Sequence, residues 1–186
     1  MKFDPETLDP RRALQVTRYH TWPRLREQSV GEHTAQVMRI MLAIYPSASV
    51  KLLTYALFHD IGEVAVGDVP YPAKNQDATI QAAFDAAELQ AHIGMVERFV
   101  LPAPIDISPL EKLIFKLAEY IEMWEWGLHE TNLGNRYAVL VSKRMYDAIH
   151  DKLYELKQLE QKETAQSTAY YLHARRSYEK DITEKV

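Results

Sequence analysis

The chain of 186 residues has no cysteine, and this absence excludes two classes of site. Without thiols, the protein can form neither disulfides nor metal sites built on thiolate ligands. It also lacks an excess of basic residues. The formal charge is −4 at pH 7, so we expect no nucleic acid polymer as a partner. Any metal site must therefore use histidine and carboxylate ligands.

Long apolar runs are missing as well. No stretch approaches the ~18 apolar residues that mark a membrane-spanning helix. The first residues, MKFDPETLDPRRALQ, are charged and contain no apolar segment typical of a secretory signal peptide. We therefore expect a cytoplasmic protein with no membrane partner.

Glycine is scarce, with six residues, and no Asn-Gly turn joins two alternating runs, so β-hairpins are not expected. Apolar residues recur instead at helical spacing. Ser29 with Glu32 three residues later is typical of a capping box at the start of a helix. Pro109 suits the first turn of another helix. Further helices are predicted at about 50–64, 79–100 and 135–162.

These elements predict an all-α fold, a single-domain helical bundle that spans residues 1–186. The stretch GDVPYPAKNQD, with two prolines, is predicted to be an irregular loop. The polar stretch after about residue 165 is either a last helix or a loose tail. No internal repeat or linker divides the chain.

Four ligand-type side chains lie in otherwise apolar helical segments. His33 shares the apolar stripe of its helix, His59 and Asp60 follow the run LLTYALF, and Glu119 lies within LIFKLAEYIEMW. Each residue alone is weak evidence for a metal site, because a single histidine in such a place is more often a core residue. Buried without partners, such groups cost several kcal/mol each. Together they predict one metal site within a helix bundle.

The predicted site suits a single divalent ion, and the sequence does not choose among Mn, Co, Fe, Ni, Zn and Mg. Such an ion acts as a Lewis acid and activates bound water as a nucleophile. Glu63 follows His59 by four residues, on the same side of the predicted helix. We expect Glu63 and Asp60 to be catalytic. Glu63 either positions the water and moves its proton or bonds to a ligand histidine.

The motifs around these residues resemble those of the HD-domain metal-dependent phosphohydrolases. That family has a His, a His-Asp pair and a distant Asp, similar to GEHTAQV, LFHDIGE and KLAEYIE here. The segments TWPRLREQSVGEHT and HDIGEVAVGDVPYPAK resemble the bacterial 5′-deoxynucleotidases and the related phage dATP triphosphohydrolases. The resemblance covers roughly residues 10 to 160. It implies a hydrolase that cleaves the 5′-phosphate ester of deoxyribonucleotides, in a bacterium or a phage-infected host cell.

The resemblance also implies a substrate site. Trp22 is expected to pack on the deoxyribose and Asp68 to help read the sugar. The family's last ligand is usually aspartate, where this chain has Glu119. The nucleotidases have arginine before the tryptophan, where this chain has Thr21. The side chains expected to bind phosphate in its place are Arg18, Arg26 and Lys74.

Two reactions and one inert alternative remain open at this point. A 5′-deoxynucleotidase cleaves a monophosphate, whereas a dNTP triphosphohydrolase acts on the triphosphate. Thr21 and the short chain favour the phage type slightly. An HD module that binds a nucleotide or a protein partner without turnover is the alternative. We also expect a homo-oligomer, a dimer or larger.

Overall fold

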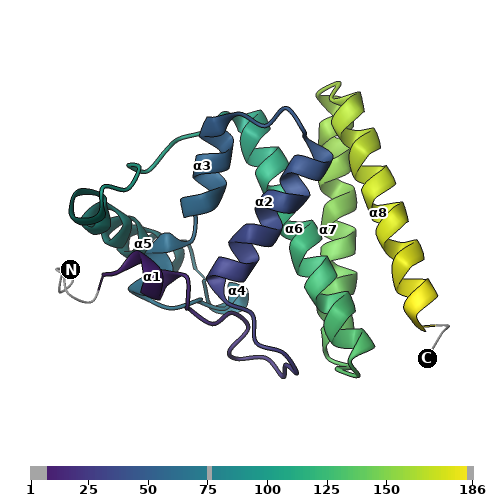
Figure 1. Cartoon of the computed structure of the whole chain (residues 1–186), viewed down its shortest axis with the longest axis horizontal. Helices are drawn as coiled ribbons and strands as arrows, with labels where there is room; N and C mark the ends of the chain where they lie inside the picture. Colours follow the sequence, from purple (N-terminus) through teal and green to yellow (C-terminus); the bar gives the residue numbers. More distant parts are fainter. Residues whose placement is uncertain (1–7, 75–76, 184–186) are drawn as a thin grey trace. The chain divides into compact units, whose positions relative to one another are not determined.

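The computed structural model describes residues 8–74 and 77–183 (Figure 1). Its elements are α1 (Pro10–Ala13), α2 (Val30–Ile44), α3 (Val50–Phe58), the 3₁₀-helix η1 (Ile61–Val64), α4 (Tyr71–Lys74), α5 (Ala78–Phe99), α6 (Pro109–Asn132), α7 (Ala138–Gln158) and α8 (Lys162–Thr183). Within the described ranges, extended pairing is limited to an isolated bridge between Thr17 and Ser29. The predicted all-α fold is confirmed. None of the helices described has the length and apolar character needed to cross a membrane.

The chain divides into two compact units. The first contains residues 1–35 and 53–106, and the second contains residues 36–52 and 107–186. Two of the three boundaries fall inside α2 and α3, so each of these helices contributes residues to both units. The single-domain organisation stays a prediction.

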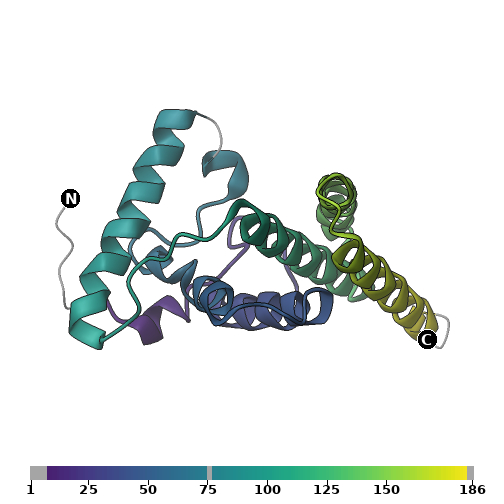
Figure 2. The same ribbon diagram turned by 90° about the horizontal axis from the view of Figure 1, so that it is seen from above.

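The first unit is built around α5 and η1. Figure 2 shows α5 as the long teal helix, with α4 beside it. Its core consists of Leu8, Ala13, Ile61, Ala91 and Met95, with half-buried apolar side chains packed against them. At Gly62 the backbones approach so closely that a Cβ would lie 2.2 Å from the Glu88 carbonyl oxygen. Glycine at this position therefore lets η1 pack directly against α5.

The helix predicted at about 50–64 is interrupted, so that prediction was wrong in one respect. α3 ends at Phe58, His59 and Asp60 form a turn, and η1 begins at Ile61. The His59 ring bonds to the carbonyl oxygen of Ala56, three residues earlier. The ring therefore takes up a carbonyl oxygen of the last turn of α3. His59 and Asp60 thus project from a turn and not from a regular helix.

The second unit contains α6, α7 and α8, the green-to-yellow helices of Figure 1. α7 packs against α6 and against α8. The start of α6 carries a complete capping box, in which Ser108 and Glu111 satisfy each other's backbone N–H groups. Pro109 occupies the first turn, as predicted.

Other boundaries differ locally from the predictions. At the start of α2 the Ser29 hydroxyl accepts a bond from the Glu32 N–H, whereas the Glu32 carboxylate pairs with Arg26. The predicted loop GDVPYPAKNQD contains the short helix α4, and two of its residues, 75 and 76, lie outside the described ranges. Residues 165–183 belong to α8, so the described part of this stretch is helical.

Candidate active site

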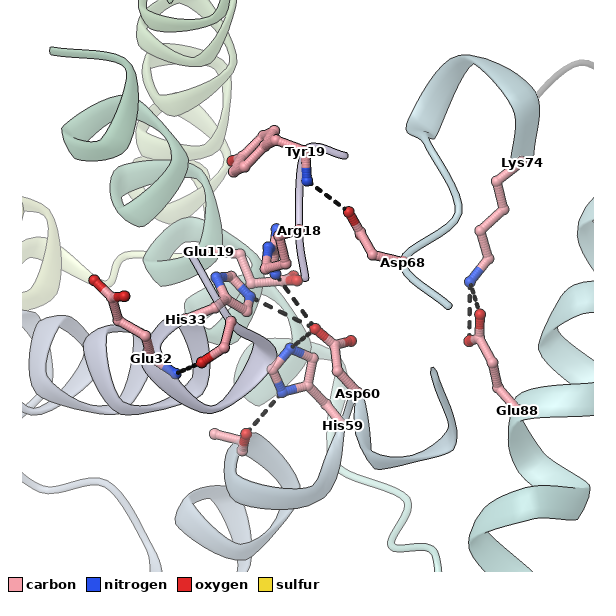
Figure 3. Close-up of polar contacts among 12 residues, drawn as sticks. Arg18, Tyr19, Glu32, His33, His59, Asp60, Asp68, Lys74, Glu88 and Glu119 are labelled. Carbon is pink, nitrogen blue, oxygen red and sulfur yellow. Dashed lines mark hydrogen bonds and ion pairs between the residues drawn. The ribbon is translucent and has the colours of Figure 1, made fainter. Parts of the chain in front are cut away.

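Three of the predicted metal ligands meet in the first unit. The ligand atoms of His33, His59 and Asp60 all lie within 4.8 Å of one another. Asp60 Oδ2 is 2.9 Å from His59 Nε2 and 3.7 Å from His33 Nε2 (Figure 3). The His33 side chain is fully buried in α2. The turn after α3 therefore brings the His-Asp pair to the buried histidine of α2.

The hydrogen bond of His59 determines which ring nitrogen faces the site. Nδ1 lies 2.7 Å from the Ala56 carbonyl oxygen, which can only accept, so Nδ1 carries a proton. In a neutral ring, Nε2 then presents a lone pair to the Asp60 carboxylate. At 2.9 Å these two acceptors attract each other only when a cation lies between them, either a proton on Nε2, which makes the ring cationic, or a metal ion. Backbone orientation of a ligand histidine is also typical of metal sites. The residues present fit a divalent ion.

Arg18 adds positive charge beside the Asp60 carboxylate. Its Nη1 atom lies 3.4 Å from Asp60 Oδ2, and the Arg18 side chain is largely buried. Burial alone would raise the pKa of Asp60. The charge and hydrogen bond of His59, with the charges of His33 and Arg18, outweigh burial and hold that pKa far below its usual value. Asp60 is thus an ionised ligand-type carboxylate.

Glu63 lies on η1 with 8% of its surface exposed. Its Oε2 atom has no hydrogen-bond partner among the described residues. Burial and then the negative charges of Asp60 and Asp68 raise the pKa of Glu63 well above its ordinary value, against the opposing effect of Arg18. The site therefore contains one carboxyl group that favours ionisation, Asp60, and one that favours its proton, Glu63.

The segment with Trp22 is fixed to the loop after η1. The Tyr19 N–H donates to Asp68 Oδ2 at 2.9 Å, a contact shown in Figure 3. The Trp22 N–H in turn donates to the Tyr19 carbonyl oxygen at 3.0 Å. Trp22 is half-buried. The structure thus connects Trp22 and Asp68 through the backbone of Tyr19.

Two basic residues predicted to bind phosphate have carboxylate partners. Lys74 Nζ lies 2.9 Å from Glu88 Oε1 (Figure 3). It also lies 3.2 Å from Asp85 Oδ1. Burial alone would lower the pKa of Lys74, but Glu88 and Asp85 outweigh it and raise the pKa. Arg26 pairs with Glu32 at 2.6 Å. Their roles at phosphate stay predictions.

Glu119 lies on α6, in the second unit. Its side chain is 15% exposed, and its Oε2 is 2.5 Å from Lys116 Nζ one helical turn earlier. Its role as the fourth ligand stays a prediction.

Sequence reasoning missed a cavity of about 200 Å³ in the first unit, beside His59. Glu88 and His92 of α5 line it, as does the 102–105 segment. The His92 ring stacks on Phe58, with centroids 6.1 Å apart, and its Nε2 lies 3.0 Å from the Pro102 carbonyl oxygen. The sequence did contain one indication of this cavity. Asp85 and Glu88 are three residues apart, a spacing that places both acids on the same face of α5.

An all-α fold in which a buried histidine meets a His-Asp pair defines a class, the HD-domain phosphohydrolases. A solved HD-domain phosphohydrolase from Listeria innocua has the same fold, with a TM-score of 0.65 over 90% of this chain and 83% of that one. Its sequence is 20% identical, so this similarity concerns the fold alone.

The sequence itself places the chain more narrowly. Residues 11–169 match the YfbR-like 5′-deoxynucleotidases, and the chain belongs to this family. A 5′-deoxynucleotidase of Enterobacter sp. (strain 638) is 26% identical over 152 residues, which cover 70% of this chain and 76% of the relative. A dATP triphosphohydrolase of Acinetobacter phage SH-Ab 15497 is 26% identical over 162 residues, covering 77% of this chain and 75% of the relative. The protein is a hydrolase, and its family implies a divalent metal.

Proposed function

We propose that this protein hydrolyses 5′-deoxyribonucleoside monophosphates to the nucleoside and phosphate. Membership of the YfbR-like family supports a metal-dependent phosphohydrolase that acts on deoxynucleotides. The convergence of His33, His59 and Asp60 is the observation that carries the proposal. These three residues would hold the ion, with Glu119 as the predicted fourth ligand.

The pairing of basic side chains with carboxylates favours a monophosphate over a triphosphate as the substrate. In the first unit Lys74 is neutralised by Glu88 and Asp85, and Arg26 by Glu32. A triphosphate carries about two more negative charges than a monophosphate and needs correspondingly more cationic partners. Arg18, beside Asp60, is the proposed phosphate-binding arginine.

A divalent ion bound here supplies Lewis-acid polarisation of a phosphate oxygen and activates water. The chain's own groups complete the reaction. Glu63, whose pKa is raised by burial, favours its protonated form and can donate a proton to the leaving 5′-oxygen. Water adds to phosphorus as the P–O5′ bond breaks, and the proton from Glu63 completes the nucleoside hydroxyl. One proton of the water passes to Glu63, which leaves orthophosphate as the second product.

The dNTP triphosphohydrolase is the second candidate. The phage dATP triphosphohydrolase matches 77% of this chain, a larger share than the 70% matched by the Enterobacter nucleotidase. That overlap, together with Thr21 in place of the nucleotidase arginine, supports this reaction.

The decisive experiment is incubation with each dNMP and dNTP plus Mn²⁺ or Co²⁺, with products resolved by chromatography. We expect nucleoside and orthophosphate from the monophosphates. Release of inorganic triphosphate from a dNTP, with dNMPs unchanged, would favour the second candidate. Absence of turnover with every nucleotide, in protein shown to contain metal, would favour the inert HD module.

A homo-oligomer and a cytoplasmic location belong to the same proposal. Exposed apolar side chains at α7, among them Leu140 at 63% and Tyr154 at 65%, support self-association. Light scattering on the purified protein tests it, since a monomer mass would contradict the prediction.

A further inference from the structure

The cavity beside His59 has no part in the reaction proposed above. It lies in the first unit, between α3, α5 and the 102–105 segment, and all the described residues that line it fall within 53–106. Its volume of about 200 Å³ is below the roughly 300–1,000 Å³ of sites for drug-sized ligands. The cavity therefore suits a ligand with one small ring system.

Aromatic side chains form two walls of this cavity. Tyr55 and Phe58 line it from α3, and His92 lines it from α5. The rings of Phe58 and His92 are inclined by only 24°, with centroids 6.1 Å apart. Leu89 and Ile105 add apolar surface. Aromatic side chains bind nucleobases by stacking, whatever the base, so these walls suit a flat heterocycle.

The polar groups at the cavity accept hydrogen bonds. His92 Nε2 lies 3.0 Å from the Pro102 carbonyl oxygen, which can only accept, so Nε2 carries a proton. Burial lowers the pKa of His92, against the opposing effect of Pro102, so the ring favours its neutral form with Nδ1 as an acceptor. The Glu88 carboxylate bonds to Lys74 at 2.9 and 3.0 Å (Figure 3), and a carboxylate has about four acceptor positions. A ligand that satisfies these groups must donate.

The charge at the cavity excludes phosphate. Asp85 and Glu88 line it, and their shared partner Lys74 offsets one of the two negative charges. The remaining negative charge repels a phosphate group. The cavity therefore suits a neutral heterocycle with N–H donors, which a nucleoside can supply and a nucleotide cannot.

We propose that the cavity binds a deoxynucleoside whose base has an exocyclic amino group, such as deoxycytidine or deoxyadenosine, and that this binding slows hydrolysis. The proposed reaction releases such nucleosides, so the assignment of the ligand as a product rests on the proposed function. His59 and Gly62 line the cavity, and Gly62 packs against the Glu88 backbone. A ligand between α3 and α5 therefore acts on the turn that carries His59 without occupying the place of the substrate.

The binding is tested by calorimetric titration of the Mn²⁺-loaded protein with deoxycytidine and deoxyuridine, which carry an amino group and an oxygen at the same ring position. Deoxycytidine should bind about tenfold more tightly or better, because the oxygen of deoxyuridine would face acceptors. Leu89→Trp fills the cavity from α5 and should weaken deoxycytidine binding about tenfold or more, and Ala103→Trp should do the same from the opposite wall. Ile93→Trp is the matched control. Leu89 and Ile93 are both 46% exposed on α5, but Ile93 does not line the cavity.

The effect on the reaction is measured with dTMP as the substrate, because thymidine has no exocyclic amino group. Saturating deoxycytidine should lower kcat about fivefold or more and leave KM unchanged, in the wild type and in Ile93→Trp. The inhibition should be lost in Leu89→Trp and Ala103→Trp. Competitive inhibition, equal affinity for the two nucleosides, or full binding in both cavity-filling variants would overturn the inference. A protein that hydrolyses no dNMP would instead contradict the proposed function, and the titration would still decide whether the cavity binds the nucleoside.

Discussion

At the scale of single residues, one oxygen atom is the centre of the site. Asp60 Oδ2 lies 2.9 Å from His59 Nε2, 3.4 Å from Arg18 Nη1 and 3.7 Å from His33 Nε2. All three neighbours are nitrogen atoms, and their charges and hydrogen bonds keep the pKa of Asp60 far below its usual value. A single ionised carboxylate thus gathers the imidazoles that a divalent ion would need.

The raised pKa of Glu63 predicts a pH-dependent effect on stability in protein stripped of metal. An acid whose pKa is higher in the folded state stabilises the fold fully below its unfolded-state pKa, here about 4.5. That contribution is lost as pH rises towards the folded-state pKa. Glu63→Gln, which resembles the protonated form, should therefore change stability little at pH 4. It should increase the free energy of unfolding progressively above pH 5. Urea titrations at several pH values in EDTA measure this, and a difference independent of pH would contradict it.

Glu119 gives a second prediction at this scale. If it is a metal ligand, Glu119→Gln removes a charge while it keeps the length of the side chain, and metal affinity should fall about 10- to 100-fold or more. Glu119→Asp restores the family's usual residue but shortens the side chain, so it should also lower affinity. Metal content after dialysis measures both. Lys116→Ala, which removes the ion-pair partner of Glu119 on α6, is the control and should retain metal. Full metal content in both Glu119 variants would show that Glu119 is not a ligand.

The convergence of His33, His59 and Asp60 could be expected from the sequence, whereas the carboxylate partners of the basic residues could not. His33 and the His59–Asp60 pair could be recognised as candidates because charged or imidazole groups in apolar segments need hydrogen-bond, ionic or metal partners nearby. Lys74 was expected at phosphate, but its partner Glu88 lies 14 residues away on another helix. Such pairings depend on how elements pack, and sequence spacing does not report that.

At the scale of elements, the break between α3 and η1 matters most. Periodicity predicted one helix through about residue 64, because apolar residues continue at helical spacing past Asp60. The interruption arises from tertiary contacts: η1 packs on α5 at Gly62, where the Glu88 backbone leaves no room for a Cβ. A contact of this kind outweighs helix propensity and cannot be deduced from the local sequence.

Gly62→Ala tests this close contact. The new Cβ would lie 2.2 Å from the Glu88 carbonyl oxygen, so backbone must move, and we expect a loss of about 1–3 kcal/mol or more in the free energy of unfolding. Gly94→Ala is the matched control on α5. There the new Cβ would meet only the end of the Leu8 side chain, at 2.9 Å, and helix propensity favours alanine by about 1 kcal/mol. Chemical denaturation compares the two, and equal effects would contradict the packing argument.

At the scale of the whole molecule, the two units share covalent elements. The chain leaves the first unit inside α2 and returns to it inside α3, so neither unit is a continuous segment. In the second unit, Glu125 of α6 binds Arg39 of α2 at 2.8 Å and accepts a bond from the Tyr171 hydroxyl of α8 at 2.6 Å. Unfolding of either unit would therefore disrupt a helix that the other unit needs. We expect the chain to unfold in one cooperative transition.

Metal binding should therefore raise the stability of the entire chain, although the three convergent ligands belong to the first unit. An ion that binds only the folded state at 100 times its Kd adds about 2.7 kcal/mol. For a chain of 186 residues this corresponds to a rise in Tm of about 5–10 °C. Calorimetry with Mn²⁺ or Co²⁺ and again with EDTA measures the shift, and it should appear in a single transition.

Asp60→Ala is the control, because it lacks the central carboxylate and its Tm should not respond to metal. Two transitions of which only one moves would show that the units unfold independently, and an equal shift in Asp60→Ala would place the ion elsewhere.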